Sequence, residues 1–214
     1  MTEEEIYSLS QAQLRQDVFV MNELGYKRDG YFVEFGATNG KDLSNTYMME
    51  KNFGWTGILA EPAWIWHDDL TANRNCHISF DCIWSKSHEL LSFDEVSEAE
   101  LSTVDTFVNS DEHAETRKTV NNKYEVYTCS LLDLLKKYKA PKVIDYLSID
   151  TEGSEFEILQ AFDFDAYQFR TITCEHNYTP MREKIYDLLT SKGYVRKLTE
   201  LSYFDDWYVL ERKI

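Results

Sequence analysis

Short apolar runs alternate along this chain with segments whose apolar residues recur at helical spacing. Buried strands are predicted where β-branched and aromatic residues run together, at 31–35, 56–60, 143–149 and 169–174. Residues 77–83 alternate between apolar and polar and predict a third strand after the first two. Helices are predicted at 2–25, 42–52 and 64–74, from Ser130 to Pro141, from Ser154 onward, and from Thr179 to Gly193.

The end of the chain shows a different pattern, in which two strands follow each other without a helix between them. Residues 194–201 and 207–210 flank a polar turn and predict an antiparallel hairpin. Together with the preceding alternation of strands and helices, this predicts one α/β domain over residues 1–214, with a doubly wound, Rossmann-like sheet.

Residues 85–127 have the weakest pattern. Leu90 to Phe93 predicts a short edge strand, and acidic residues dominate from Asp94 to Glu115. We interpret residues 94–127 as an acidic insertion whose charges face solvent. In the N-terminal helix, Gln11, Gln16 and Asp17 are likewise expected to face solvent rather than a binding site.

A ligand site is predicted at the carboxyl ends of the parallel strands, where polar residues gather. The stretch YFVEFGATNG, residues 31–40, ends a strand with Gly36 and Gly40, which let a ligand approach the backbone or simply form a tight turn. Its acid, Glu34, favours a ligand with an ammonium group or hydroxyls over one that offers only phosphates.

Other strand ends carry residues with more than one interpretation. Ser44, Asn45 and Thr46 either cap the next helix or bind a carboxylate at its first turn. Glu61 has the position that holds ribose hydroxyls in nucleotide sites. Asp81 either accepts a hydrogen bond from an amino group such as adenine N6 or lies in a surface turn.

Charge and composition exclude some classes of function. The formal net charge of −16 argues against nucleic acid or an anionic membrane as the partner. No apolar stretch reaches the roughly 18 to 20 residues of a membrane span, and the acidic start MTEEEIYSLS is unlike a signal peptide. Four scattered cysteines predict reduced thiols in a cytoplasmic protein: Cys76, Cys82, Cys129 and Cys174.

An ordered set of segments resembles the FkbM-type family of S-adenosylmethionine-dependent methyltransferases. These segments are SQAQLRQDVFV, FVEFGATNG, SNT, GWTGILAEP, SIDTEGSEFEIL and CEHN, and only residues 85–127 resemble the family weakly. The resemblance implies a seven-stranded methyltransferase sheet with a reversed last hairpin. It also implies S-adenosylmethionine as the cofactor and a hydroxyl of a carbohydrate or another small molecule as the methyl acceptor.

The resemblance also implies roles for individual residues. The cofactor's methionine portion would contact Glu34, Gly36, Ala37, Thr38, Asn39 and Gly40, with Asn45 and Thr46 near its carboxylate. Glu61, followed by Pro62, would bind the ribose, and Asp81, followed by Cys82, would bind the adenine. Thr38 departs from the general G-x-G-x-G pattern by replacing the middle glycine, so the backbone there is expected to be less open.

Catalysis on an alcohol requires a base or a metal ion to remove the proton of the hydroxyl. The resemblance places Asp150 and Glu152 beside the methyl group and the acceptor. His176, next to Glu175, is a candidate base or a structural histidine. A divalent ion bound by Asp150 with Glu175 or Asn177 is the alternative, since carboxylate and amide oxygens are suitable ligands.

Two other functional classes are compatible with parts of the pattern. Glu61 would also suit the ribose of NAD in an oxidoreductase, although the glycines are spaced G-x-x-x-G rather than G-x-G-x-x-G. The second class is a non-catalytic interaction module that has retained a cofactor-binding fold. In such a module the acidic insertion would be the surface that binds a partner. Acidic residues at five strand ends argue against loss of the site.

Overall fold

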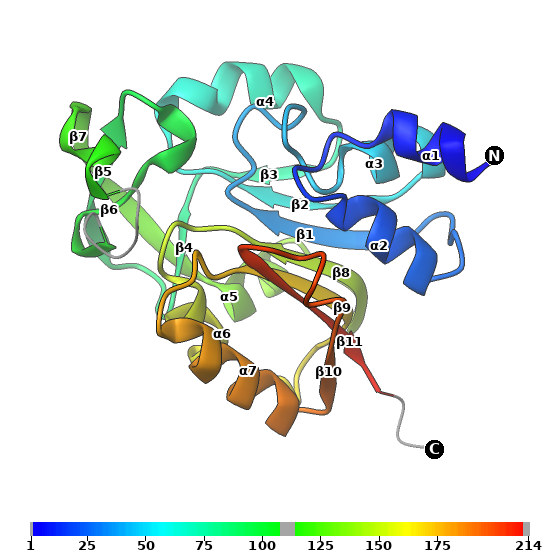
Figure 1. Ribbon diagram of the computed structural model, residues 1–214. Coiled ribbons are helices and arrows are strands. Elements are labelled where there is room, and N and C mark those ends of the chain that lie inside the picture. Colours follow the sequence, from blue (N-terminus) through cyan, green and yellow to red (C-terminus); the bar gives the residue numbers. More distant parts are fainter. Residues whose placement is uncertain (1, 108–113, 212–214) are drawn as a thin grey trace.

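A computed structural model describes residues 2–107 and 114–211, and these residues form a seven-stranded and a four-stranded sheet. The larger sheet has the order β10-β11-β9-β8-β1-β2-β3 and confirms the predicted doubly wound sheet with its terminal antiparallel hairpin (Figure 1). Its strands are β1 (Tyr31–Phe35), β2 (Thr56–Ala60), β3 (His77–Ser79), β8 (Val143–Ile149), β9 (Gln168–Glu175), β10 (Tyr194–Lys197) and β11 (Asp205–Leu210).

Helices cover both faces of this sheet (Figure 1). The helices are α1 (Glu3–Leu9), α2 (Gln16–Glu23), α3 (Tyr47–Phe53), α4 (His67–Asn73), α5 (Leu131–Lys137), α6 (Glu155–Ala161) and α7 (Met181–Ser191). The first four lie on one face and the last three on the other (Figure 1). Alternate residues of each strand therefore enter two separate cores.

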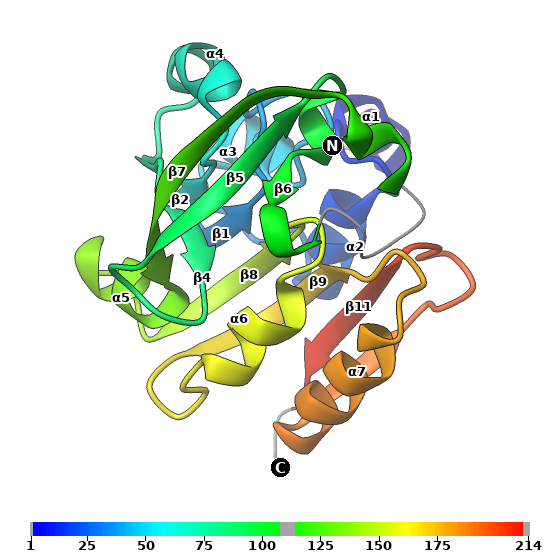
Figure 2. The same ribbon diagram turned by 90° about the vertical axis from the view of Figure 1, so that its left-hand side faces the viewer.

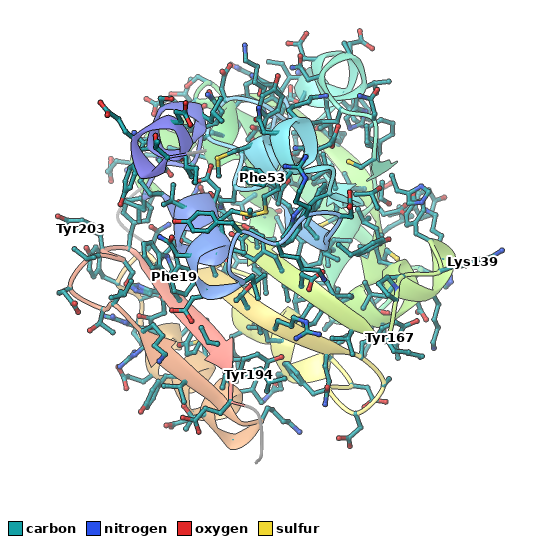
Figure 3. The ribbon with its side chains drawn as sticks, turned by 90° about the vertical axis from the view of Figure 1, so that its right-hand side faces the viewer. Phe19, Phe53, Lys139, Tyr167, Tyr194 and Tyr203 are labelled. Carbon is teal, nitrogen blue, oxygen red and sulfur yellow. The ribbon has the colours of Figure 1, made fainter. Side chains whose placement is uncertain are left out.

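One core joins the first four helices to the sheet, and it includes Phe19 and Phe53, which are labelled in Figure 3. The other core lies under α5, α6 and α7, and it includes Tyr167 and Tyr194, labelled in the same figure. Because both faces of the sheet are buried, its strands are continuous apolar runs. This explains why β1, β2 and β8 begin and end where the sequence predicts.

The predicted single helix at 2–25 is wrong, because the chain forms two helices separated by residues 10–15. The break is fixed by local bonds: Ser10 Oγ donates to Asp17 Oδ1 at 2.6 Å, and Arg15 has a left-handed φ of 67°. Gln16 and Asp17 are buried rather than solvent-facing, with 3% and 0% of their surface exposed. Gln11 is half-buried.

The predicted strand at 77–83 is also wrong in its second half. The chain leaves the large sheet after β3 and enters the smaller sheet as β4 (Cys82–Trp84). The smaller sheet has the order β4-β7-β5-β6, with β5 (Leu90–Val96), β6 (Thr103–Val104) and β7 (Val120–Ser130). Figure 2 shows β5 and β7 running side by side across this end of the molecule.

The acidic insertion is therefore largely this second sheet rather than an irregular flap. Short 3-10 turns connect its strands, at η2 (Ala99–Leu101), η3 (Asp105–Phe107) and η5 (Thr116–Lys118); a further one, η1 (Trp64–Trp66), precedes α4. Asp94 and Glu95 are buried, so the prediction that the charges of this segment face solvent is wrong for them. Residues 108–113, with Asp111 and Glu112, lie outside the described residues.

Candidate functional site

A cavity opens at the carboxyl ends of β1, β2 and β8. The chain order reverses between β1 and β8, which is the usual position of a ligand site in an open α/β sheet. The cavity and its open mouth together enclose about 1030 Å³. The main sheet, the second sheet and the segment between α1 and α2 all contribute to its wall.

Glu34, at the end of β1, organises the loop that follows rather than presenting a free carboxylate. Its oxygens accept hydrogen bonds from the backbone N–H of Asn45 at 2.7 Å and from the hydroxyls of Ser44 and Thr46. The buried Arg74 guanidinium lies 3.7 Å from the same carboxylate and donates to the Thr46 hydroxyl at 2.8 Å. No pattern in the sequence points to Arg74, which contacts this loop from its position directly after α4.

This loop differs from the predicted helix at 42–52, because α3 begins only at Tyr47. Asn45 therefore precedes the helix. Its Nδ2 donates to Ser148 Oγ at 2.9 Å, while its buried Oδ1 has no partner among the described residues and the side chain lines the cavity. Leu43, predicted on the buried side of the helix, is 47% exposed and lies at the cavity.

The glycine turn is shaped by close contact with β8. Gly36 has a φ of +69°, and a Cβ on it would lie 1.9 Å from the carbonyl oxygen of Asp150. Only glycine fits that contact. Thr38, at the middle-glycine position, adopts a left-handed φ of 45° and donates its N–H to Glu61 Oε2 at 2.9 Å. Several predicted cofactor residues do not line the cavity, namely Ala37, Asn39, Gly40 and Thr46.

Glu61 lies at the centre of the cavity wall and keeps acceptor capacity for a ligand. Its Oε1 accepts the N–H of Ala63 at 2.8 Å, and its Oε2 accepts the N–H of Thr38. Burial raises the pKa of this carboxyl to about 7. A carboxylate has about four acceptor positions, so two backbone donors leave room for a pair of hydroxyls.

Several of the lining side chains are apolar. Pro62 and the β4 residues Cys82 and Ile83 line the cavity, as do Phe93 of β5 and Val104 of β6. Asp81, predicted to bind adenine, does not line the cavity. Its carboxylate accepts hydrogen bonds from Ser79 Oγ and Lys137 Nζ, both at 2.9 Å.

Other residues at the site are acidic. Asp150, Glu152 and Glu175 each place a carboxylate oxygen within 4.8 Å of the others. Burial raises the pKa of Asp150 to about 6, and a hydrogen bond from Glu175 opposes that shift. Burial and the nearby Asp150 charge raise the pKa of Glu175 well above its ordinary value. Glu152 forms an ion pair with the buried Arg117 of the second sheet's connection.

His176 does not line this cavity. It is buried, its Nδ1 accepts the N–H of Tyr178 at 3.0 Å, and its Nε2 lies 3.8 Å from Asp206. Burial lowers its pKa to about 4. The geometry therefore supports the structural interpretation of His176.

Three residues that contribute to the site had been missed or misplaced in the sequence. Gln13, in the segment between α1 and α2, and Gln16, the first residue of α2, line the cavity. Gln16 Nε2 donates to the buried Asp205 at 2.8 Å, and Asp205 pairs in register with Glu175 across β11 and β9. The acidic position at the start of the last strand was the available signal for Asp205.

The fold and the cavity define an α/β domain with an acidic cavity at the sheet's switch point. Residues 34–196 match the model of the methyltransferase FkbM domain, and the chain belongs to this family. The resemblance drawn from the sequence motifs is thereby confirmed. A search of the curated proteins found no match.

Solved structures show distant similarity. The precorrin-6y C5,15-methyltransferase of Geobacter metallireducens is 11% identical, with a TM-score of 0.47, 90% of this chain and 85% of that chain being covered. The METTL16 methyltransferase domain is 12% identical, with a TM-score of 0.46 and coverages of 92% and 66%. A human methyltransferase 10 domain containing protein is 10% identical, with a TM-score of 0.43 and coverages of 94% and 82%. These similarities are too distant to bear on substrate.

Proposed function

We propose that this methyltransferase-family protein uses S-adenosylmethionine to methylate a hydroxyl of a small molecule such as a carbohydrate. The observation that carries the proposal is a single cavity whose wall combines apolar side chains with acidic ones, Glu61 among them. S-Adenosylmethionine combines an apolar adenine, two ribose hydroxyls and a positively charged amino acid, so it is complementary to such a wall.

The residues present suit each portion of that cofactor. Phe93, Val104 and Pro62 offer an apolar slot for a base, and Glu61 offers acceptors for the two ribose hydroxyls. The buried Asn45 Oδ1 offers an acceptor for the cofactor's ammonium. The described lining residues include several acids and no Lys or Arg, which does not suit the pyrophosphate of NAD.

Asp150 is our candidate for the general base. It lines the cavity, and its pKa of about 6 allows it to be ionised and to accept a proton near neutral pH. The bound cofactor would supply an electrophilic methyl group on a cationic sulfur. Asp150 would take the proton from the acceptor hydroxyl as the oxygen bonds to the methyl carbon, and Glu175 would hold Asp150 in place by its hydrogen bond.

A divalent cation is the alternative activator at the same place. Asp150, Glu152 and Glu175 provide oxygen ligands of the type that Mg²⁺ binds. Arg117 already neutralises one of them through its ion pair with Glu152. We therefore propose that Asp150 acts without an ion. Activity that is lost on chelation and restored by Mg²⁺ would instead assign the site to a metal.

The proposal also covers partners and location. The acidic cavity and the net charge of −16 favour a small uncharged acceptor over nucleic acid. Four free cysteines agree with a cytoplasmic protein. No helix in the described parts of the chain has the length and apolar character to cross a membrane.

Calorimetric titration tests the cofactor assignment directly. S-Adenosylmethionine and S-adenosylhomocysteine should bind with one site per chain and raise the melting temperature, because a ligand that binds only the native state stabilises it. NAD should do neither. Binding of NAD without binding of S-adenosylhomocysteine would contradict the proposal and restore the oxidoreductase interpretation. Binding of neither cofactor would favour a non-catalytic module.

A further inference from the structure

The segment between α1 and α2 forms a wall of the cavity, although it lies outside residues 34–196 that match the family model. Two amide side chains, Gln13 of this segment and Gln16, the first residue of α2, line the cavity. Gln13 is exposed at the mouth, whereas Gln16 is 3% exposed. Neither residue has a role in the proposed cofactor contacts. Their placement therefore raises the question of which ligand they bind.

Gln16 is held in one orientation at both ends of its amide. Its Oε1 accepts the backbone N–H of Leu14 at 2.9 Å, and its Nε2 donates to Asp205 Oδ2 at 2.8 Å. The second bond joins residues 189 positions apart, and Asp205 is also outside the matched residues. A buried amide fixed in this way is preorganised, so it can bind a ligand without paying further side-chain entropy.

The segment itself is rigid. Asp17 Oδ1 accepts the Ser10 hydroxyl at 2.6 Å and the N–H of Val18 at 2.8 Å. An isolated parallel β-bridge between Ala12 and Leu43 ties the segment to the loop after the glycine turn. Gln13 and Leu43 consequently lie together at the mouth of the cavity, with Glu100 of the second sheet as a further exposed lining residue.

The position of Gln16 along the cavity identifies the ligand portion that it meets. Asp205, its partner, pairs with Glu175 across neighbouring strands, and a carboxylate oxygen of Glu175 lies within 4.8 Å of one of Asp150. Gln16 is thus connected through Asp205 and Glu175 to the proposed base, and it lines the same cavity as Asp150. We propose that Gln13 and Gln16 bind the methyl acceptor, and that this acceptor is uncharged and rich in hydroxyls. This inference rests on the proposed methyltransferase function.

The chemistry of the amides supports that substrate class. A glutamine amide both donates and accepts hydrogen bonds, as a hydroxyl does, and the pair can bind neighbouring hydroxyls of one molecule. Asp150, Glu175 and Asp205 would repel a phosphate or carboxylate on the acceptor.

The test uses the full chain saturated with S-adenosylhomocysteine, whose own binding is measured first. Three sets of probes are then titrated: methyl glycosides of neutral hexoses and deoxyhexoses, sugar phosphates with uronates, and amino sugars. Methyl transfer from S-adenosylmethionine to each probe is followed by mass spectrometry. The variants are Gln13→Ala and Gln16→Met, and Gln11→Ala is the matched control, because Gln11 lies in the same segment but not in the cavity lining.

We expect neutral glycosides to bind and to be methylated, with affinity lowered about tenfold or more in Gln16→Met and less in Gln13→Ala. Affinity for S-adenosylhomocysteine should change by less than about twofold in both variants and in the control. Should Gln16→Met unfold, Gln13→Ala still reports on the mouth. Preferred binding of anionic or amino sugars, no binding by any neutral glycoside, or equal loss of cofactor affinity would overturn the inference. Failure of S-adenosylhomocysteine to bind the wild type would instead refute the proposed function.

Discussion

Replacement of Glu61 by glutamine is the sharpest test of the cofactor site. The substitution keeps the size of the side chain and one of its oxygens, but the new NH₂ group cannot accept a hydrogen bond. In the structure both oxygens accept backbone N–H groups, from Ala63 at 2.8 Å and from Thr38 at 2.9 Å. Glu61→Gln thus leaves one of these donors facing another donor and removes a charged acceptor from the ribose position.

The expected magnitude follows from these contacts. A hydrogen bond to a charged group contributes about 1.5 to 3 kcal/mol, and a buried donor without a partner costs a similar amount. The loss of cofactor binding free energy should be about 2 to 4 kcal/mol, because the displaced Thr38 loop and the ribose are affected together. That range corresponds to a dissociation constant raised roughly 30- to 700-fold.

Isothermal titration with S-adenosylhomocysteine measures this change, and circular dichroism verifies the fold of the variant. Asp81→Asn is the matched control: it removes a carboxylate charge at the next strand end, where the side chain bonds Ser79 and Lys137 outside the cavity. Its affinity should change less than about twofold. If Glu61→Gln binds the cofactor as the wild type does, the ribose site lies elsewhere. A large loss in Asp81→Asn would restore the predicted adenine contact.

Three further outcomes are expected. Asp150→Asn should lower turnover about 100-fold or more with little change in cofactor affinity, whereas His176→Ala should lower stability more than turnover; the reverse pattern in steady-state kinetics would make His176 the base. Burial raises the pKa of Glu61 and of Asp205 to about 7. Such carboxyls hold more protons in the native state than in the unfolded state, so their contribution to stability is present at low pH and is lost as pH rises through about 7. Urea unfolding should show lower stability at about pH 8 than at about pH 5.5, and Glu61→Gln should reduce the difference; equal stability at both pH values would contradict this. Arg117→Met removes the ion pair between the second sheet's connection and Glu152, so it should weaken cofactor binding in an equilibrium titration. An unchanged affinity would mean that the second sheet does not contribute to the cofactor site.

The strand pattern could be predicted from the sequence because both faces of the main sheet are buried. β1, β2 and β8 are continuous apolar runs, and their boundaries agree with the predicted ones to the residue. The last hairpin was also predicted correctly, since its two strands follow each other around a polar turn. Local periodicity determines these elements, so no distant partner was needed to find them.

The second sheet could not be predicted in this way. β5 and β7 pair with each other across a connection that includes polar 3-10 turns, and β4 joins them from a run that reads as the continuation of β3. The acids in this segment suggested solvent exposure, but Asp94 is paired with Lys123 at 3.0 Å and Glu95 accepts the Tyr124 hydroxyl at 2.9 Å. These partners come together only when β5 and β7 pair, so the sequence has no periodic pattern that predicts them.

The same reason explains why the site was only partly predicted. Glu61 and Asp150 stand at strand ends, where their position alone places them in the cavity. Gln16 was assigned to solvent because its polar character within a helical pattern is typical of an exposed face. Its burial depends on Asp205, 189 residues away, and on the break of the helix at Arg15. Local periodicity cannot predict polar residues whose burial depends on partners far away in the sequence. In this protein such residues form the wall at which we expect the acceptor to bind.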